Sequence, residues 1–328
     1  MKKIYNLLIA IVLCFSSVFC IAGCKDSDSE FNFYIPDGAP ALAMAKLIYE
    51  DNHFGYDDVD YEVVSSSNIG NCILQKKADV AILPVNMASK ILNDGKEYKV
   101  IATVTNGNLY IVGNKDINSL NDLTGEVVGV IGQGNVPDLN FRALLSENDV
   151  VYQTSESVIA DKVAIRYFAE ASNLLPMLKT NKLNFGLLPE PAVSKLLSMA
   201  SNFNVELDIQ TLWEGGSYPQ AVLVMRRSLC ENTTLVNNIL SELEENESWV
   251  LENSEKAVNA INSELEDGVV ASLQTTISRD AITNCNIDIR KTTSDEIARI
   301  KAYLSKIKAV VSNAVGEYYD NMFWQIQQ

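Results

Sequence analysis

AILPVNMASKIL, at residues 81–92, recurs in altered form as GLLPEPAVSKLL at residues 186–197. Each copy begins with a short apolar run, passes through a proline and continues with apolar residues at helical spacing. Each copy therefore predicts a buried strand, a proline turn and a helix. A strand-turn-helix unit that occurs twice indicates two α/β halves with parallel-rich sheets and helical crossovers.

The segments that open the two halves have the same order of elements. Residues 31–35 alternate in character as a strand does, and a turn rich in Pro and Gly leads into a predicted helix at residues 41–49. In the second half, residues 127–131 form the predicted strand, 132–137 the turn and 138–146 the helix. Ligands of open α/β sheets bind at the carboxyl ends of strands, where such turns lie. The sequence therefore predicts a shared cleft, although each single turn is also explained as an efficient connection.

The chain returns to the first half after completing the second. A strand within residues 205–212 precedes an apolar run at 220–225, and helical periodicity follows from residue 231 onward. We expect these late helices to pack on the first lobe, so that the second lobe is an insertion within it. The predicted organisation is a signal peptide at 1–23, a tether at 24–30, a first lobe at 31–113 and 219–328, and a second lobe at 114–218.

The first 24 residues have the layout of a secretory signal. Lys2 and Lys3 precede the almost wholly apolar residues 4–19, and Ile-Ala-Gly-Cys follows at residues 21–24. This run resembles the lipobox of bacterial lipoproteins, which implies cleavage before Cys24, lipidation of its thiol and attachment to the extracytoplasmic face of the cell membrane. An ordinary signal peptide or an uncleaved anchor is the alternative.

Composition argues against several classes of partner. The chain has 328 residues, with 26 Lys and Arg against 42 Asp and Glu, and a formal net charge of -16 at pH 7. An acidic surface of this kind disfavours nucleic acid and anionic lipid. No apolar stretch after the signal approaches the ~20 residues that a membrane span needs. The sequence therefore predicts a protein tethered to the membrane by lipid.

Cysteine and histidine are too few for most metal or nucleophilic sites. Beyond Cys24, the mature chain would hold Cys72, Cys230 and Cys285, at spacings unlike those of metal sites. We expect buried, unreactive thiols, of which at least one is free unless it pairs between chains. His53 is the only histidine, and no nucleophile lies in a context that would pair with it. The sequence predicts no catalytic residue, no metal and no cofactor.

Six short motifs together resemble one protein family. The motifs are IPDGAPALA (35–43), DVAILP (79–84), SLNDLTG (119–125), LLPEP (187–191), CNI (285–287) and VGEYY (315–319). In this order they resemble the substrate-binding proteins of bacterial ABC importers, in the branch that binds sulfonates, nitrate and thiamine pyrimidines. The resemblance covers nearly all of residues 31–328. It implies a type II periplasmic-binding fold, two lobes joined by a hinge that close on one small molecule, a monomer, and ABC permease and ATPase subunits as partners.

The resemblance places ligand-binding residues in the turns of both lobes and near the hinge. The candidates are Asp37, Gly38, Ala39, Pro40, Asn68, Gly70, Asn71, Asn86, Met87, Asn108, Gly134, Asn135, Glu170, Ser172, Glu190 and Tyr218. Tyr218 and Trp213 offer rings on which a planar ligand would stack, although packing in the core or hinge explains either ring equally well. In the loop at residues 168–172, this chain keeps Glu170 but lacks the histidine that relatives often have.

The charges of the candidate cleft bear on its ligand. The cleft holds Asp37, Glu170 and Glu190 without clustered Lys or Arg. Helix N-termini alone can hold an anion, but this balance of side chains favours a neutral or cationic polar ligand rich in hydrogen-bond donors. A pyrimidine-like heterocycle or thiamine precursor fits that description. An alkanesulfonate, taurine or nitrate is the alternative cargo.

Two other functions are compatible with the same fold. Enzymes of pyrimidine-precursor and menaquinone synthesis share it, but the pyrimidine-precursor synthases rely on an active-site histidine and a cysteine-rich motif that have no match here. A lipoprotein sensor or adhesin without a transport partner is the third alternative. A permease and an ATPase encoded next to this chain would favour the importer.

Overall fold

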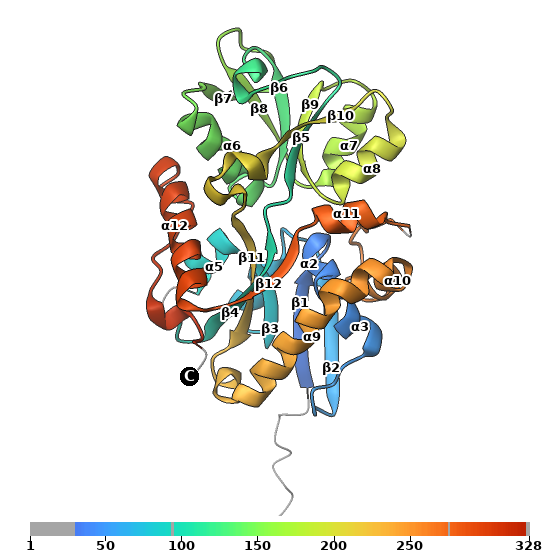
Figure 1. Ribbon diagram of the computed structural model, residues 1–328, viewed down its shortest axis with the longest axis vertical. Helices are drawn as coiled ribbons and strands as arrows, with labels where there is room; N and C mark the ends of the chain where they lie inside the picture. Colours follow the sequence, from blue (N-terminus) through green and yellow to red (C-terminus); the bar gives the residue numbers. More distant parts are fainter. Residues whose placement is uncertain (1–29, 93–94, 275, 326–328) are drawn as a thin grey trace, which may run out of the picture.

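The computed structural model describes residues 30–92, 95–274 and 276–325. The predicted signal peptide, the predicted lipidation site Cys24 and all but the last residue of the predicted tether lie outside the described residues. The described chain folds into two α/β lobes, which follow each other along the long axis of the molecule (Figure 1).

The first lobe is built on a mixed sheet. Its six strands in the described chain lie in the order β12 (Ile287–Lys291), β4 (Tyr98–Asn106), β11 (Pro219–Arg226), β3 (Val80–Pro84), β1 (Glu30–Pro36) and β2 (Asp58–Val64). β1 pairs in parallel with β2 and β3, whereas β11 runs antiparallel to β3 and β4. β3 is apolar along its whole length because it lies inside the sheet with both faces covered.

The second lobe repeats this arrangement. Its six strands in the described residues lie in the order β10 (Asn204–Asp208), β5 (Leu109–Gly113), β9 (Phe185–Pro189), β6 (Val127–Ile131), β8 (Val163–Phe168) and β7 (Tyr152–Thr154). β6 pairs in parallel with β8 and β9, whereas β5 runs antiparallel to β9 and β10. The predicted α/β class with two parallel-rich sheets is therefore confirmed.

Both copies of the repeated pattern form the predicted strand, proline turn and helix. β3 continues into α5 (Val85–Ile91), and β9 continues beyond its proline into α8 (Ala192–Met199). In each sheet the proline strand has a parallel neighbour on one side and an antiparallel neighbour on the other. The two units thus occupy equivalent places in the two sheets.

The chain passes between the lobes at residues 107 and 108, which join β4 to β5. β5 pairs only within the second sheet among the described strands, so Leu109–Gly113 lies there although the predicted boundary places it in the first lobe. On the way back, Tyr218 precedes β11, and its carbonyl oxygen accepts a hydrogen bond from the Gly107 N–H (2.9 Å). The two crossing segments therefore lie side by side.

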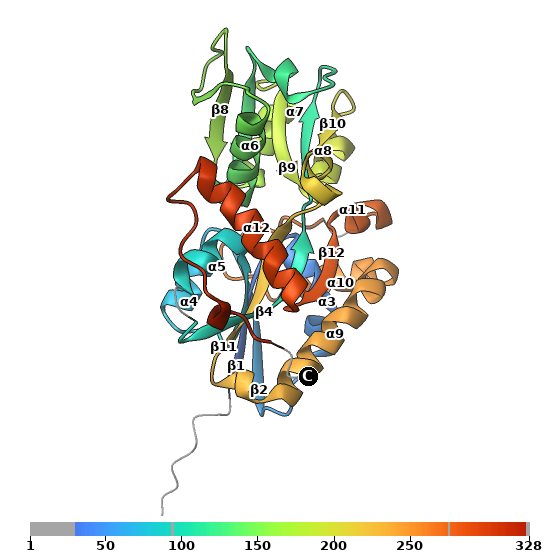
Figure 2. The ribbon, with the colours of Figure 1, turned by 60° about the vertical axis from the view of Figure 1, so that its left-hand side comes forward.

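Helices cover both faces of each sheet (Figures 1 and 2). On the first sheet, one face packs against α2 (Ala39–Leu42), α3 (Ala45–Glu50), α9 (Thr233–Glu252) and α10 (Ser254–Ser263), and the other against α4 (Ile69–Leu74), α5 and α12 (Ser294–Val310). On the second sheet, one face packs against α6 (Val136–Glu147), and the other against α7 (Ala171–Lys179) and α8. α11 (Arg279–Asn284) precedes β12. Short 3-10 helices occupy Leu120–Leu123, Ile209–Leu212, Glu214–Gly216, Leu229–Glu231 and Asp320–Met322.

The helix predicted at residues 41–49 is wrong in one respect, because two short helices, α2 and α3, replace it. The side chain of Asn246, on α9, explains the break. Its Oδ1 accepts from the Lys46 N–H (2.8 Å), and its Nδ2 donates to the Leu42 carbonyl oxygen (3.0 Å). These are the two backbone groups that would pair with each other in a continuous helix. Asn246 is fully buried, so the break is sealed inside the protein.

The sequence predicted that helix α12 packs on the first lobe, but the helix lies against both lobes. It contacts α5 of the first lobe and α6 of the second, and Figure 2 shows it running along the side of the molecule past both. The Asn140 Nδ2 of α6 donates to the Tyr303 hydroxyl of α12 (3.0 Å), and both residues are buried. The two lobes therefore share a helix as well as two crossing segments.

Cys72, Cys230 and Cys285 are free thiols, and all three are buried as predicted. Burial raises the pKa of each thiol, that of Cys230 to about 12. The thiolate is the reactive form of cysteine, so these residues are chemically quiet parts of the core.

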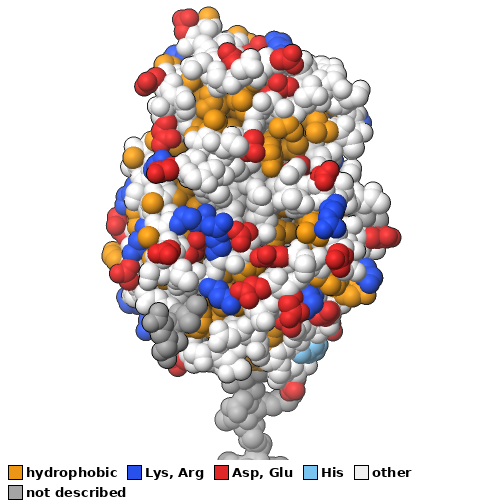
Figure 3. Space-filling model, viewed as in Figure 1, with side chains coloured by type: hydrophobic (Ala, Val, Ile, Leu, Met, Phe, Trp, Pro, Cys, Tyr) orange, Lys and Arg blue, Asp and Glu red, His pale blue; other side chains and the backbone are white. Residues whose placement is uncertain are grey.

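The surface and the helices bear on possible partners. None of the helices among the described residues is long and apolar enough to cross a membrane. On the face that Figure 3 shows, Lys and Arg side chains lie beside Asp and Glu side chains. This mixed pattern lacks the continuous basic surface, on that face, with which nucleic-acid-binding proteins neutralise phosphates.

Candidate functional site

A cavity of about 210 Å³ lies between the two lobes. Its wall includes residues at the carboxyl ends of strands from both sheets: the last residues of β1, β3, β6 and β9, which are Pro36, Pro84, Ile131 and Pro189, and Ala169, which follows β8. Carboxyl ends of parallel strands are where open α/β sheets bind ligands. The proline turns of both repeated units thus meet at one cavity.

Nine of the predicted binding residues line this cavity. They are Asp37, Gly38, Ala39, Pro40, Asn108, Asn135, Glu170, Ser172 and Glu190. The other seven lie outside the lining: Asn68, Gly70, Asn71, Asn86, Met87, Gly134 and Tyr218. Most residues that reach the cavity lie in strand-end turns, whereas those outside it are either packed, as Asn86 and Tyr218 are, or exposed, as Asn71 and Gly134 are.

Residue Asn86 shows why some of the candidates lie outside. Its side chain is buried, and its Nδ2 donates to the Gly134 carbonyl oxygen of the second lobe (3.2 Å). Met87 packs against the core, and its Sδ lies 3.0 Å from where a Cβ on Gly70 would stand. Asn86 and Gly134 thus join the lobes.

The predicted ring for ligand stacking is part of the core. Tyr218 is fully buried, and its ring stacks on Tyr303 with centroids 5.5 Å apart and planes 12° apart. Trp213 lies against both rings, at centroid distances of 5.5 and 5.2 Å. Among the described residues that line the cavity, none is aromatic. Packing between the lobes, the alternative explanation for these rings, is what the structure has.

The carboxylate of Asp37 holds down a segment that the sequence analysis missed. Its Oδ2 accepts from the Ser272 N–H (2.7 Å), which fixes residues 269–272 against the cavity. Burial raises the pKa of Asp37, and the nearby charge of Glu170 adds to the rise, while hydrogen bonds from Ser272 and Gly38 oppose it. Oδ1 is buried and has no hydrogen-bond partner in the described structure. Asp37 is thus a half-buried carboxyl group in the first-lobe wall, with one oxygen bonded to Ser272.

Glu170 approaches from the second lobe. It is the N-cap residue of α7, and its Oε1 accepts from the hydroxyl of Ser65, which follows β2 in the first lobe. Ser65 also lines the cavity. This hydrogen bond joins the two lobes at the cavity, which Glu170 and Asp37 line from opposite lobes.

The Glu190 carboxylate serves its own helix. Its Oε2 accepts from the Ser194 N–H (3.0 Å) and its Oε1 from the Ser194 hydroxyl (2.9 Å), in the first turn of α8. Burial raises the pKa of Glu190, and the hydrogen bonds from Ser194 oppose the rise. Its backbone N–H donates to the carbonyl oxygen of Asn108 (3.0 Å). Asn108 in turn accepts from Gln220 Nε2 at its side-chain oxygen (2.7 Å), so the crossing segments form part of the wall.

Lys195 is a cationic lining residue that sequence reasoning missed. Its Nζ donates to the Ser272 carbonyl oxygen (3.4 Å). The repeat draws attention to this lysine, because Lys195 occupies the place that Lys90 has in the first copy. Lys90, however, is exposed. The pattern alone does not distinguish the two lysines.

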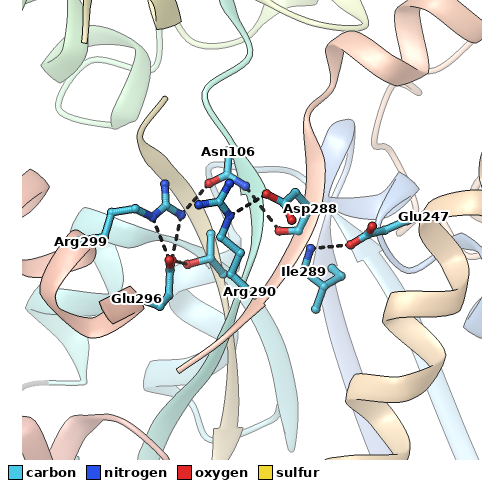
Figure 4. Close-up of polar contacts among 8 residues, drawn as sticks. Asn106, Glu247, Asp288, Ile289, Arg290, Glu296 and Arg299 are labelled. Atoms are coloured by element: carbon cyan, nitrogen blue, oxygen red, sulfur yellow. Dashed lines mark hydrogen bonds and ion pairs between the residues drawn. The ribbon is translucent and has the colours of Figure 1, made fainter. Parts of the chain in front are cut away.

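A polar network supports the crossing beside the cavity (Figure 4). Asn106 ends β4, and its Oδ1 accepts from Arg299 of α12 (2.6 Å) while its Nδ2 donates to the Asp288 carbonyl oxygen of β12 (3.4 Å). Arg299 also pairs with the buried Glu296, which accepts from the hydroxyl of Thr103. The strand that leaves the first lobe is thus fixed to α12 and β12 at its last residue.

Comparisons with known proteins show the same architecture in solved structures. No protein-family model matches the sequence, and no curated protein sequence matches it significantly. The structure is similar to that of an ABC transporter from Parabacteroides distasonis, with a TM-score of 0.74 and 18% identity over 92% of this chain and 100% of that one. It is also similar to the periplasmic aliphatic sulphonate binding protein SsuA from Escherichia coli, with a TM-score of 0.65 and 11% identity over 92% and 94% of the two chains. SsuA from Xanthomonas axonopodis pv. citri, bound to MOPS, gives a TM-score of 0.62 and 10% identity over 88% and 98%.

The chain has the two-lobed fold of ABC-transporter substrate-binding proteins, which is the type II periplasmic-binding fold that the sequence motifs predicted. Within that class, the likeness to the alkanesulfonate-binding SsuA proteins is one of fold, at identities of 10% and 11%.

Proposed function

We propose that this protein is the substrate-binding component of an ABC importer and captures one small polar molecule between its lobes. The observation that carries the proposal is the cavity, to which the strand-end turns of both lobes contribute. A ligand in that position contacts both lobes only when they are closed, so its binding energy favours the closed form. A permease can then distinguish loaded from empty protein.

Binding is favoured over catalysis by the chemistry of the wall. The described lining residues include no histidine or cysteine. The Ser65 hydroxyl donates to Glu170, whose carboxylate has no third side chain among the described residues to orient it as in a triad, and Ser272 bonds Asp37 through its backbone N–H. A lipoprotein sensor would use the same cavity without a permease.

The cargo predicted from sequence is a pyrimidine-like heterocycle, with alkanesulfonate, taurine or nitrate as the alternative. The cavity supplies carboxylates for amino and hydroxyl donors of a heterocycle. It supplies no aromatic ring among its described lining residues for stacking. The heterocycle proposal therefore depends on hydrogen bonding alone.

We further propose that the protein is a monomer held at the outer face of the cell membrane by lipid on Cys24. The lipobox-like residues 21–24 support this, as does the lack of a spanning helix among the described residues. Mass spectrometry of the N-terminal peptide tests it. Acyl groups on Cys24 are expected, and an unmodified N-terminus upstream of Cys24 would contradict the anchor.

A screen of the full-length protein with small metabolites tests the main proposal. Each compound is scored by thermal shift and by small-angle scattering. A ligand at about 100 times its Kd stabilises by about 2.7 kcal/mol, and closure should reduce the radius of gyration. A compound that does both supports the receptor. If no metabolite stabilises the protein or changes its scattering, the importer proposal is wrong.

A further inference from the structure

Three of the helices that begin at the cavity wall have an acidic side chain in or just before their first turn. α6, α7 and α8 all begin at the cavity wall. Glu190 accepts from the Ser194 N–H in the first turn of α8, Glu170 is the N-cap of α7, and Asp138 in the first turn of α6 accepts from the Gly134 N–H (2.8 Å). The partial positive charge of a helix N-terminus normally attracts an anionic ligand. Of these carboxylates, that of Glu190 already accepts from an N-terminal N–H of its helix, so an anion at α8 would have to displace it.

The charges of the wall point the same way. Among the described lining residues, Asp37, Glu170 and Glu190 are acidic and Lys195 is the one cation. The Nζ of Lys195 donates to the backbone carbonyl oxygen of Ser272 (3.4 Å). An anion entering this cavity would face more acidic than basic side chains. A cation would offset this excess.

Two of these carboxylates lie on opposite lobes. Glu190 is committed to Ser194, whereas one oxygen of Asp37 has no hydrogen-bond partner in the described structure and Glu170 accepts from Ser65 across the lobes. Lobe closure brings Asp37 and Glu170 towards one another, which like charges oppose. A cation placed between them removes that opposition and therefore stabilises the closed form specifically.

We infer that the ligand is a small aliphatic molecule whose protonated nitrogen binds between Asp37 and Glu170. This inference rests on the proposed function and names the substrate class of the same cavity. The aliphatic character follows from the wall, where prolines and alanines predominate and aromatic rings are lacking among the described residues. The small size follows from the volume of about 210 Å³. The chain thus selects against the sulfonates that the SsuA structures are named for.

A matched panel of probes tests the charge of the ligand. Ethanolamine, 1,3-diaminopropane, 1,4-diaminobutane and guanidinobutane are compared with alcohols and sulfonates of the same carbon chains. Thermal shift on the full-length protein ranks the panel, and isothermal titration measures the Kd of each hit. At least one amine or guanidine should bind at least about tenfold more tightly than its neutral and anionic counterparts.

Two conservative variants test the position of the nitrogen. Asp37→Asn and Glu170→Gln each keep an oxygen that can accept from Ser272 or Ser65, so the lobes should still fold and touch. Each substitution should raise the Kd of the amine by about tenfold or more. The matched controls are Asp161→Asn and Glu214→Gln, which remove exposed carboxylates outside the lining and should leave the Kd unchanged.

The outcomes separate this inference from the proposed function. A sulfonate that binds in preference to its amine counterpart overturns the inference and keeps the receptor. An amine that binds Asp37→Asn and Glu170→Gln as tightly as it binds the unmodified protein also overturns it. So does a general screen that finds a bound metabolite when none of the nitrogen cations of the panel binds at ten times the concentration of that metabolite. The receptor itself falls only if that general screen finds no ligand of any class.

Discussion

The two copies of the strand-proline-helix unit have nearly the same sequence pattern and different tasks. In the first, the Asn86 side chain donates a hydrogen bond to the Gly134 carbonyl oxygen of the second lobe, and Lys90 is exposed to solvent. In the second, Glu190 caps α8, and Lys195 lines the cavity. One copy joins the lobes and the other helps to build the binding wall.

The serines of the two units show how one residue type is used twice. The Ser89 hydroxyl donates to the Asn86 carbonyl oxygen (2.6 Å) and accepts from the Gly316 N–H (3.1 Å), so it holds the C-terminal segment. The Ser194 hydroxyl donates to the Glu190 carboxylate (2.9 Å) and holds a charge. Local pattern sets the turn of helix on which each serine lies, while the neighbours set its role.

The largest effect should come from breaking the first unit at its contact with Gly316. A Cβ at Gly316 would collide with the Ser89 carbonyl oxygen and lie 2.8 Å from Lys90 Cα, both of them backbone. Gly316→Ala should therefore destabilise the protein by about 2–4 kcal/mol. Urea unfolding measures the loss.

Gly186→Ala, in the second unit, is the matched control. Its Cβ would lie 2.8 Å from Leu178 Cδ1, the end of a flexible side chain that can turn away. Because Leu178 is buried, this adjustment should cost about 1–2 kcal/mol, less than the backbone collision at Gly316. Equal losses in the two variants would show that the first unit is not fixed by its backbone contact.

The two serines should differ next. Ser89→Ala leaves the Gly316 N–H without its acceptor and should cost about 1–2 kcal/mol, whereas Ser194→Ala leaves the Ser194 N–H still bonded to Glu190 and should cost about 0.5–1 kcal/mol. The midpoints of urea unfolding give both values. The reverse order would remove the structural basis of the comparison.

The acid at the second unit should produce a pH dependence that the first unit lacks. Burial raises the pKa of Glu190 in the folded state, so its protonation favours the fold and this contribution is lost as pH rises through the folded pKa. Glu190→Gln should be more stable than the unmodified protein at pH 7, by about 1 kcal/mol per unit of raised pKa. The difference should shrink as pH falls towards the ordinary glutamate value.

Melting temperatures of both proteins between pH 4 and pH 8 test this sign. A Glu190→Gln difference that stays constant with pH would mean that the substitution acts through packing. A difference that grows as pH falls would show that hydrogen bonds from Ser194 outweigh burial.

The smallest effect concerns the two lysines. If the ligand is cationic, Lys195→Met removes a like charge from the cavity wall and should tighten amine binding by about two- to fivefold. Lys90→Met, at the equivalent exposed position, should leave the Kd unchanged. Isothermal titration with the best amine of the panel measures the Kd for each variant. Weaker binding of the amine to Lys195→Met would assign Lys195 a different role.

Much of the fold was predictable because its signals are local. The strand predicted at 127–131 is β6, and the apolar run at 220–225 lies within β11. The turns after the buried strands were correctly expected at the cleft edge, since carboxyl ends of parallel strands share one edge of a sheet. Nine of the named candidates line the cavity for that reason.

The parts that could not be predicted depend on residues far apart in the chain. Asn246 splits the first helix by bonding Leu42 and Lys46, about 200 positions away, and no local pattern in residues 41–49 announces it. Tyr303 packs on Tyr218 only because α12 crosses both lobes. The segment at 269–272 lies at the cavity, where Asp37 and Lys195, distant in the sequence, both bond Ser272.

The sequence by itself determined two α/β halves, their order along the chain and the turns at their strand ends, because apolar periodicity and proline placement act over a few residues. Only the tertiary structure decided which of two equivalent lysines lines the cavity, which rings are buried in the core and which carboxylates are already used. Those outcomes depend on burial and hydrogen-bond partners, and both are set by neighbours that the fold brings together.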